Sequence, residues 1–112
     1  MKIKVGQRTY QINLVDNATS RALAQMLPMT IQMSELNGNE KYCYLPQSLP
    51  TCFRRVGKIQ AGDVMLYGDN CIVIFYQSFV TGYAYTNIGR IENGADLAAA
   101  LGSGAVQVDW SL

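Results

Sequence analysis

Polar and apolar positions alternate along the first part of the chain and predict a β-hairpin. The alternation runs through residues 2–5 and again through 9–15, and a period of two is that of a strand with one buried face. Asp16 and Asn17 then offer an N-cap. Residues 18–27 carry apolar side chains at helical spacing, and the proline that follows ends the helix because the residue before a proline avoids helical geometry.

The middle of the chain predicts short strands separated by tight turns. An Asn-Gly pair at 37–38 joins the expected strands 30–36 and 40–45, because both residue types tolerate positive φ. The runs 64–67 and 71–76 are nearly continuously apolar. Such runs are expected of strands that are covered on both faces or closed into a barrel.

The remaining segments are assigned from their turn residues and the spacing of their apolar positions. In chain order we expect a stiff two-proline loop at 46–51, a Tyr- and Gly-bearing connection at 78–86, a short strand at 87–91, a helix at 95–101 and a closing strand at 105–110. Asn93 or Gly94 is expected to begin the second helix, and Gly102 to end it. Residues 53–60 fit no single element and hold the only local basic cluster.

Together these elements predict a mainly β protein: a closed barrel of about eight strands with two short helices covering its open ends. Closure would remove the unpaired edges that otherwise risk aggregation. A split α+β sandwich is the structural alternative. The length of 112 residues suits one domain over residues 1–112.

Composition and charge then exclude several classes of function. Apolar residues make up 49% of the chain and charged residues 15%, which suits a packed core. Nine basic residues against eight acidic ones give a net charge of +1, so no strong field favours nucleic acid or an anionic membrane as a partner. No stretch approaches the roughly 18 apolar residues of a membrane span.

Histidine is absent and the three cysteines form no CxxC pair, so Ser-His-Asp and Cys-His catalysis are excluded and a zinc site is not expected. Free thiols suit a reducing compartment. We therefore expect a soluble cytoplasmic protein with no metal and no cofactor.

Four pieces of sequence, spread over nearly the whole chain, carry a family resemblance. They are Leu-Pro at 27–28, Tyr-Leu-Pro at 44–46 with Ser-Leu-Pro-Thr at 48–51, Ala-Gly-Asp-Val at 61–64 with the run 72–76, and Asn-Ile-Gly-Arg-Ile at 87–91 before the last helix and strand. In these pieces the chain resembles the cyclophilin-like family of small microbial proteins. The resemblance implies a closed barrel with a helix at each end. The wider relatives, the cyclophilins, are peptidyl-prolyl isomerases that bind a proline-containing peptide on the outer barrel surface, but fold alone does not carry activity.

Two alignments with the cyclophilins place the site differently. In the first, residues 53–56 and 59–63 are similar to the Phe-His-Arg-Val and Ile-Gln-Gly-Gly-Asp of a cyclophilin. That similarity implies Arg55 as the guanidinium that polarises the X-Pro amide, with Gln60 as its neighbour. In the second, the catalytic Arg position falls near 42–44, where no arginine lies. We favour the second because the strand order matches it better.

Aromatic residues are the other candidates for ligand binding. Under both alignments Phe75 lies on the strand that supplies a pocket phenylalanine in cyclophilins. Tyr44, Tyr83 and Tyr85 could line a groove for an apolar or prolyl ligand, because tyrosine offers a rigid ring with a polar tip. The ordinary alternative is packing within the core and across strands.

We expect a binding module with a surface groove for a peptide or small apolar ligand and without efficient isomerase activity. The alternative is a weak peptidyl-prolyl isomerase that uses Arg55 with Gln60 and Phe75, since rotation about an X-Pro bond needs no nucleophile or base. A third possibility is assembly through a free barrel edge at 2–5 or 105–110.

Overall fold

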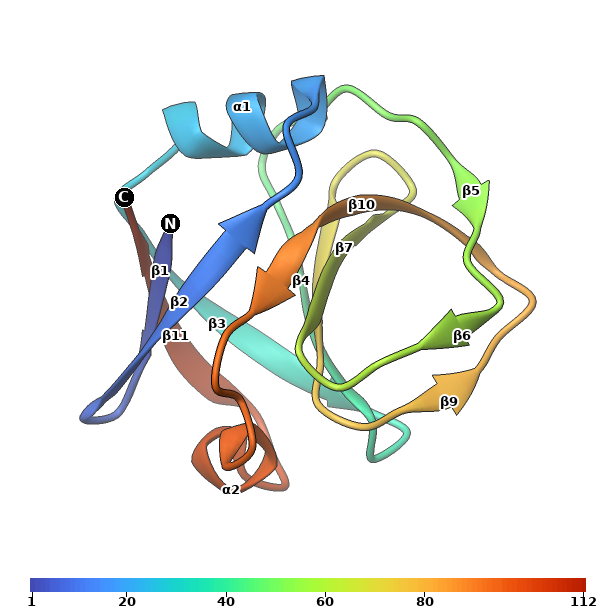
Figure 1. The fold of residues 1–112 in the computed structure, drawn as a ribbon. Coiled ribbons are helices and arrows are strands. Elements are labelled where there is room, and N and C mark those ends of the chain that lie inside the picture. Colours follow the sequence, from blue (N-terminus) through green and yellow to red (C-terminus); the bar gives the residue numbers. More distant parts are fainter.

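The computed structural model describes residues 1–112 and contains eight antiparallel strands that close into a barrel (Figure 1). The barrel strands are β1 (Lys2–Val5), β2 (Arg8–Leu14), β3 (Met29–Leu36), β4 (Glu40–Tyr44), β7 (Asp63–Tyr67), β8 (Cys71–Phe75), β10 (Ala84–Ile91) and β11 (Val106–Ser111). They follow one another in the order β2-β1-β11-β3-β4-β8-β7-β10, and β10 pairs with β2 to close the ring. The predicted mainly β barrel is thus confirmed, and the split sandwich is not formed.

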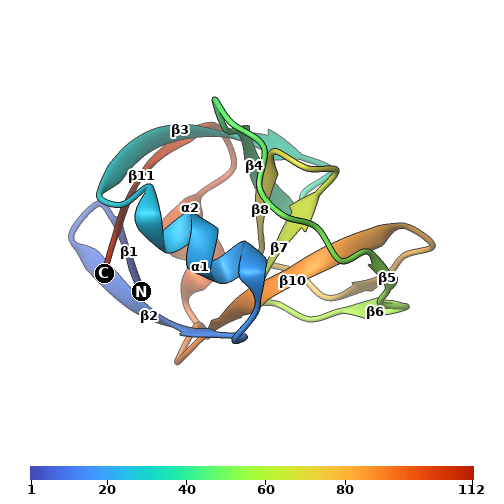
Figure 2. The same ribbon diagram turned by 90° about the horizontal axis from the view of Figure 1, so that it is seen from above.

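Two short helices lie at opposite ends of this barrel (Figure 1). Helix α1 spans Ala18–Gln25 and α2 spans Leu97–Leu101. Seen from above, α1 lies across the barrel with α2 behind it (Figure 2). Leucines on both helices are buried in the cluster that fills the barrel, so the helices close the core at each end. Neither helix is long enough and apolar enough to cross a membrane.

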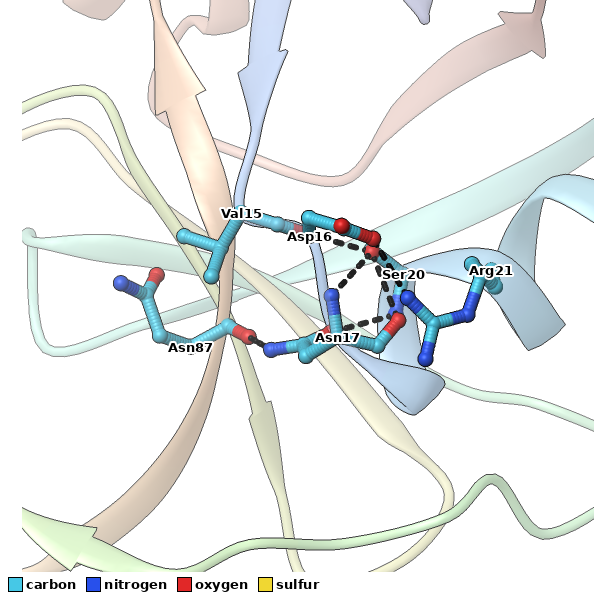
Figure 3. Close-up of polar contacts among 6 residues, drawn as sticks. All are labelled: Val15, Asp16, Asn17, Ser20, Arg21 and Asn87. Atoms are coloured by element: carbon cyan, nitrogen blue, oxygen red, sulfur yellow. Dashed lines mark hydrogen bonds and ion pairs between the residues drawn. The ribbon is translucent and has the colours of Figure 1, made fainter.

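The start of α1 is fixed by a capping box, which confirms the predicted N-cap (Figure 3). Asn17 accepts a 2.8 Å hydrogen bond from the Ser20 backbone N–H, and the Ser20 hydroxyl accepts one from the Asn17 backbone N–H. The Asn17 amide also donates to the Asn87 carbonyl at 2.8 Å. Because Asn87 belongs to β10, the cap both starts the helix and ties it to the barrel wall. The helix ends at Gln25 rather than at the expected Leu27, with Met26 as C-cap.

The second helix begins later than predicted, at Leu97, and its N-cap residue makes contacts that the local sequence does not show. Asp96, not Asn93 or Gly94, stands at its N-cap and makes no capping bond. The Asp96 carboxylate instead accepts hydrogen bonds from Arg8 at 2.7 Å and Tyr10 at 2.9 Å. Tertiary partners have therefore taken the acid that would cap the helix. Gly102 ends the helix as predicted, with φ of 73°.

The expected connection at 78–86 is wrong, because it contains two strand segments. The short strand β9 (Phe79–Val80) pairs with β6 (Lys58–Ile59), and β10 begins at Ala84 rather than at Asn87. The ambiguous stretch 53–60 also supplies β5 (Arg54–Arg55), which pairs with the start of β10. We call the paired β6 and β9 strands the flap, which lies outside the barrel (Figure 1).

Strand β10 is bent so that it can pair with two different neighbours. It pairs with β7 along its first part and with β2 along its last, and its register with β7 shifts between Asn87 and Gly89. A Cβ atom at Gly89 would clash with the backbone oxygen of Asn13. Glycine is thus required where β10 crosses closest to β2.

Two separate hydrophobic clusters explain the continuously apolar strands. The larger one, of 18 buried residues, fills the barrel. The smaller one, of 6 buried residues, lies on the outer face of β7 and β8 and includes Ile59 of the flap. These strands are therefore covered on both faces, by the barrel interior and by the flap.

Neither of the two strands considered as free edges is free. Strand β1 pairs with both β2 and β11, and β11 pairs with both β1 and β3. The barrel therefore offers no open edge there, and the idea of assembly through such an edge is wrong.

Candidate functional site

A pocket of about 330 Å³ opens on the outer face of the barrel, between β4 and the flap. Most of its lining is apolar or aromatic and comes from the end of β3, the β3–β4 turn, β4, β7, β8, β9, the β9–β10 connection and the start of β10. The lining residues are Leu36, Asn37, Asn39, Glu40, Tyr42, Tyr44, Tyr67, Cys71, Val73, Phe79, Tyr83 and Tyr85.

The alternation of side chains along β4 decides which residues reach the pocket. Glu40, Tyr42 and Tyr44 point outward and line it, whereas Lys41 and Cys43 point the other way, toward the barrel interior. On the neighbouring strand, Val73 stands opposite Tyr42 and Cys71 opposite Tyr44. One strand therefore supplies both the wall of the pocket and part of the barrel core.

Contacting tyrosine rings form the mouth and the floor of the pocket. Tyr67 lies 6.0 Å from Tyr83 and 5.7 Å from Tyr85 between ring centroids, and Tyr42 lies 6.0 Å from Tyr44. Tyr44 and Tyr83 are 64% and 63% exposed, whereas Tyr85 is buried. Exposed aromatic rings gathered around a cavity are typical of binding surfaces, where the ring contributes apolar contact and the hydroxyl a hydrogen bond.

The predicted site residues fall into three groups. Tyr44, Tyr83 and Tyr85 line the pocket together. Phe75 does not line it: its side chain is fully buried beneath the pocket, with ring centroids 5.5 Å from Tyr85 and 5.6 Å from Phe79. Phe75 therefore supports the aromatic floor from behind.

Arg55 and Gln60 form the third group, and neither lines the pocket. Arg55 is exposed on β5, opposite Ala84 of β10. Gln60 is exposed after β6, and its backbone N–H donates to Asp63 at 2.9 Å. The structure does not bring the proposed amide-polarising guanidinium into the aromatic pocket.

Glu40 is the one charged residue of the lining, and sequence reasoning missed it. It is only 8% exposed, and its carboxylate takes part in none of the ion pairs of the protein. Burial raises the pKa of this carboxyl, and the nearby charge of Glu35 raises it further. The alternation that puts Tyr42 and Tyr44 on one face could have revealed Glu40 on the same face.

Cys71 contributes a thiol to the pocket but no nucleophile. Burial, followed by the charges of Glu40 and Cys43, raises the pKa of Cys71 to about 11. The thiol therefore stays protonated near neutral pH, and a thiolate is what reacts. Nowhere do three or more His, Cys, Asp or Glu side chains gather as they would around a metal ion.

A comparison with known protein families agrees with this architecture. The model of the Cyclophilin-like family matches residues 3–111 of the chain. No curated protein and no solved structure matches it. Because the match covers nearly the whole barrel, from β1 to β11, the chain belongs to the cyclophilin-like family.

Proposed function

We propose that this domain is a binding module whose aromatic pocket takes a peptide segment or a small apolar ligand, without efficient isomerase activity. The observation that carries the proposal is the combination of exposed tyrosine rings at the mouth with a buried, flap-covered floor. A volume of about 330 Å³ stands at the small end of ligand pockets. It suits one amino-acid side chain or a compound of similar size.

The lining chemistry supports binding better than catalysis. An isomerase must stabilise the twisted X-Pro amide, for which a guanidinium beside the proline is well suited. The pocket lining contains no arginine and no lysine, and Arg55 lies outside it. Its single carboxyl and its protonated thiol do not offer the cationic hydrogen-bond donor that the arginine mechanism uses.

The proposal is tested by titrating ¹⁵N-labelled protein with capped tripeptides that carry proline, leucine or norleucine in the middle. We expect shift changes centred on residues 42–44 and 83–85. Tyr83→Ala should weaken binding by about tenfold, since a packed aromatic contact contributes about 1 kcal/mol or more. Val80→Ala is the matched control, because Val80 is an 82% exposed residue on β9 that does not line the pocket. Shift changes spread evenly over the surface would contradict the proposal.

Isomerase activity is measured separately, on X-Pro peptides, with wild type beside Arg55→Ala. We expect no acceleration above the uncatalysed rate at high protein concentration. Acceleration that disappears in Arg55→Ala would instead favour the alternative, a weak peptidyl-prolyl isomerase.

A further inference from the structure

The pocket contains a carboxylate that nothing in the protein neutralises. Glu40 is more than nine-tenths buried and lines the pocket. It joins no ion pair, and the charged group that acts on it is another carboxylate, that of Glu35. A buried charge without a partner is costly, so a cation that enters the pocket and pairs with Glu40 would relieve this cost.

The nearest lysine along the chain cannot serve as this partner. Lys41 is fully buried on the opposite face of β4. Its ammonium group donates to Glu35 at 2.9 Å and to the carbonyls of Gly102 and Gly104. These three acceptors use all three of its N–H donors. Lys41, the only cation on this strand, is therefore not available to form an ion pair with Glu40.

A second unpaired acceptor lies next to Glu40. Asn39, the residue before Glu40, also lines the pocket, and its Oδ1 atom is buried without a hydrogen-bond partner. Buried acceptors are nearly always paired in folded proteins, so an unpaired one marks a place where a donor is missing. Two adjacent residues of the pocket lining thus carry side-chain acceptors that no donor of the protein satisfies.

We propose that the pocket binds a primary ammonium or guanidinium group on an apolar stem, with Glu40 as its counter-ion and Asn39 as a further acceptor. This rests on the proposed function and names the chemistry of its ligand. The stem would lie against the tyrosine rings, whose faces also attract cations. Because Glu40 is the only charged residue of the lining, a cation meets no repulsion there, whereas an anion meets an unscreened carboxylate.

The test compares two capped tripeptides that differ in one charge, acetyl-Ala-Lys-Ala-amide and acetyl-Ala-norleucine-Ala-amide. We expect the lysine peptide to bind at least about tenfold more tightly, as a charge-assisted hydrogen bond in a buried site implies. Glu40→Gln should abolish this preference. Glu92→Gln is the matched control and should retain it, since the Glu92 carboxylate pairs with Asn13 and lies outside the pocket. Pentylamine is titrated beside the peptides to distinguish a free amine from a basic side chain.

Each outcome bears on the inference. A lysine preference that depends on Glu40 supports it: pentylamine binding as tightly as the lysine peptide then indicates a free amine, and weaker binding indicates a peptide side chain. Equal affinity of wild type for both peptides overturns the inference even if no variant folds. In that case the binding of the norleucine peptide leaves the proposed function standing. Failure of every ligand to bind overturns both.

Discussion

Two glutamates, Glu35 and Glu40, flank the tight β3–β4 turn, and their carboxylates lie in opposite environments. Glu35 accepts hydrogen bonds from Lys41 at 2.9 Å, from Tyr76 at 2.5 Å and from the Gly38 backbone at 2.7 Å. Glu40, at the start of the next strand, lines the pocket without any ion pair. Glu35 thus receives three hydrogen bonds from within the protein. The carboxylate of Glu40 has no cationic partner in the protein and faces the pocket.

Their pKa values record this difference. Burial alone would raise the pKa of Glu35, but the hydrogen bonds from Tyr76, Lys41 and Gly38 outweigh it and hold the pKa below its ordinary value. For Glu40, burial and the charge of Glu35 both raise the pKa. A carboxylate that stabilises a fold is thus distinguished from one that awaits a partner by its hydrogen-bond donors and not by its depth.

The largest loss of stability is expected from Lys41→Met, which removes the cation that pairs with Glu35. Glu35 and two carbonyls at the end of α2 would lose their shared donor. Breaking a buried ion pair by removing one partner costs about 3–5 kcal/mol, which urea denaturation can measure. Lys4→Met, at an exposed position on β1, should change the free energy of unfolding little. If Lys41→Met lowers the free energy of unfolding no more than Lys4→Met does, the contacts of Lys41 do not stabilise the fold.

Glu35→Gln is expected to destabilise by about 2 kcal/mol at neutral pH, because hydrogen bonds to a charged group are lost. Its folded pKa lies below the ordinary value of 4.5. The stabilisation from this carboxylate is therefore present above 4.5 and is lost as the pH falls through the folded pKa. Melting curves of wild type and variant should converge in acid. If the two melting temperatures still differ in acid, the loss of stability comes from a change in side-chain packing and not from the loss of the Glu35 charge.

Glu40→Gln is the same substitution across the turn, and the expected effect is smaller and opposite in sign. Because the folded pKa of Glu40 lies above 4.5, the wild type loses stability as the pH rises from 4.5 through that folded value. Glutamine avoids this loss, so the variant should be more stable at about pH 7, by roughly 1 kcal/mol, and gain little at about pH 4. Thermal unfolding at both pH values measures it. Destabilisation at neutral pH would mean that Glu40 has a partner in the free protein.

The overall fold was predictable because it depends on local patterns. The period of two in β1 and β2, the Asn17 cap and the Gly102 end are each encoded within a few residues. The flap was not predictable from sequence, because its strands are two residues long and exist through pairing between distant segments. The missing capping bond at Asp96 was not predictable for the same reason, because Arg8 and Tyr10, which are distant in sequence, donate hydrogen bonds to its carboxylate.

The candidate site was predictable in its aromatic part only. Tyr44, Tyr83 and Tyr85 attract attention by residue type, and all three line the pocket. Glu40 looks like an ordinary acid after a turn, and its significance comes from burial without a partner. That property depends on the elements that pack around Glu40 and on the direction of the Lys41 side chain, and neither is predictable from neighbouring residues.

The alternation along β4 has a consequence for how this protein can change. Position 41 anchors the strand to the end of α2, while positions 40, 42 and 44 face the pocket. Substitutions in the second set leave the anchor untouched. A combinatorial library at positions 40, 42 and 44 is therefore expected to change which ligands the pocket binds without unfolding the barrel. Ligand preference can change during evolution by substitutions at the same three positions.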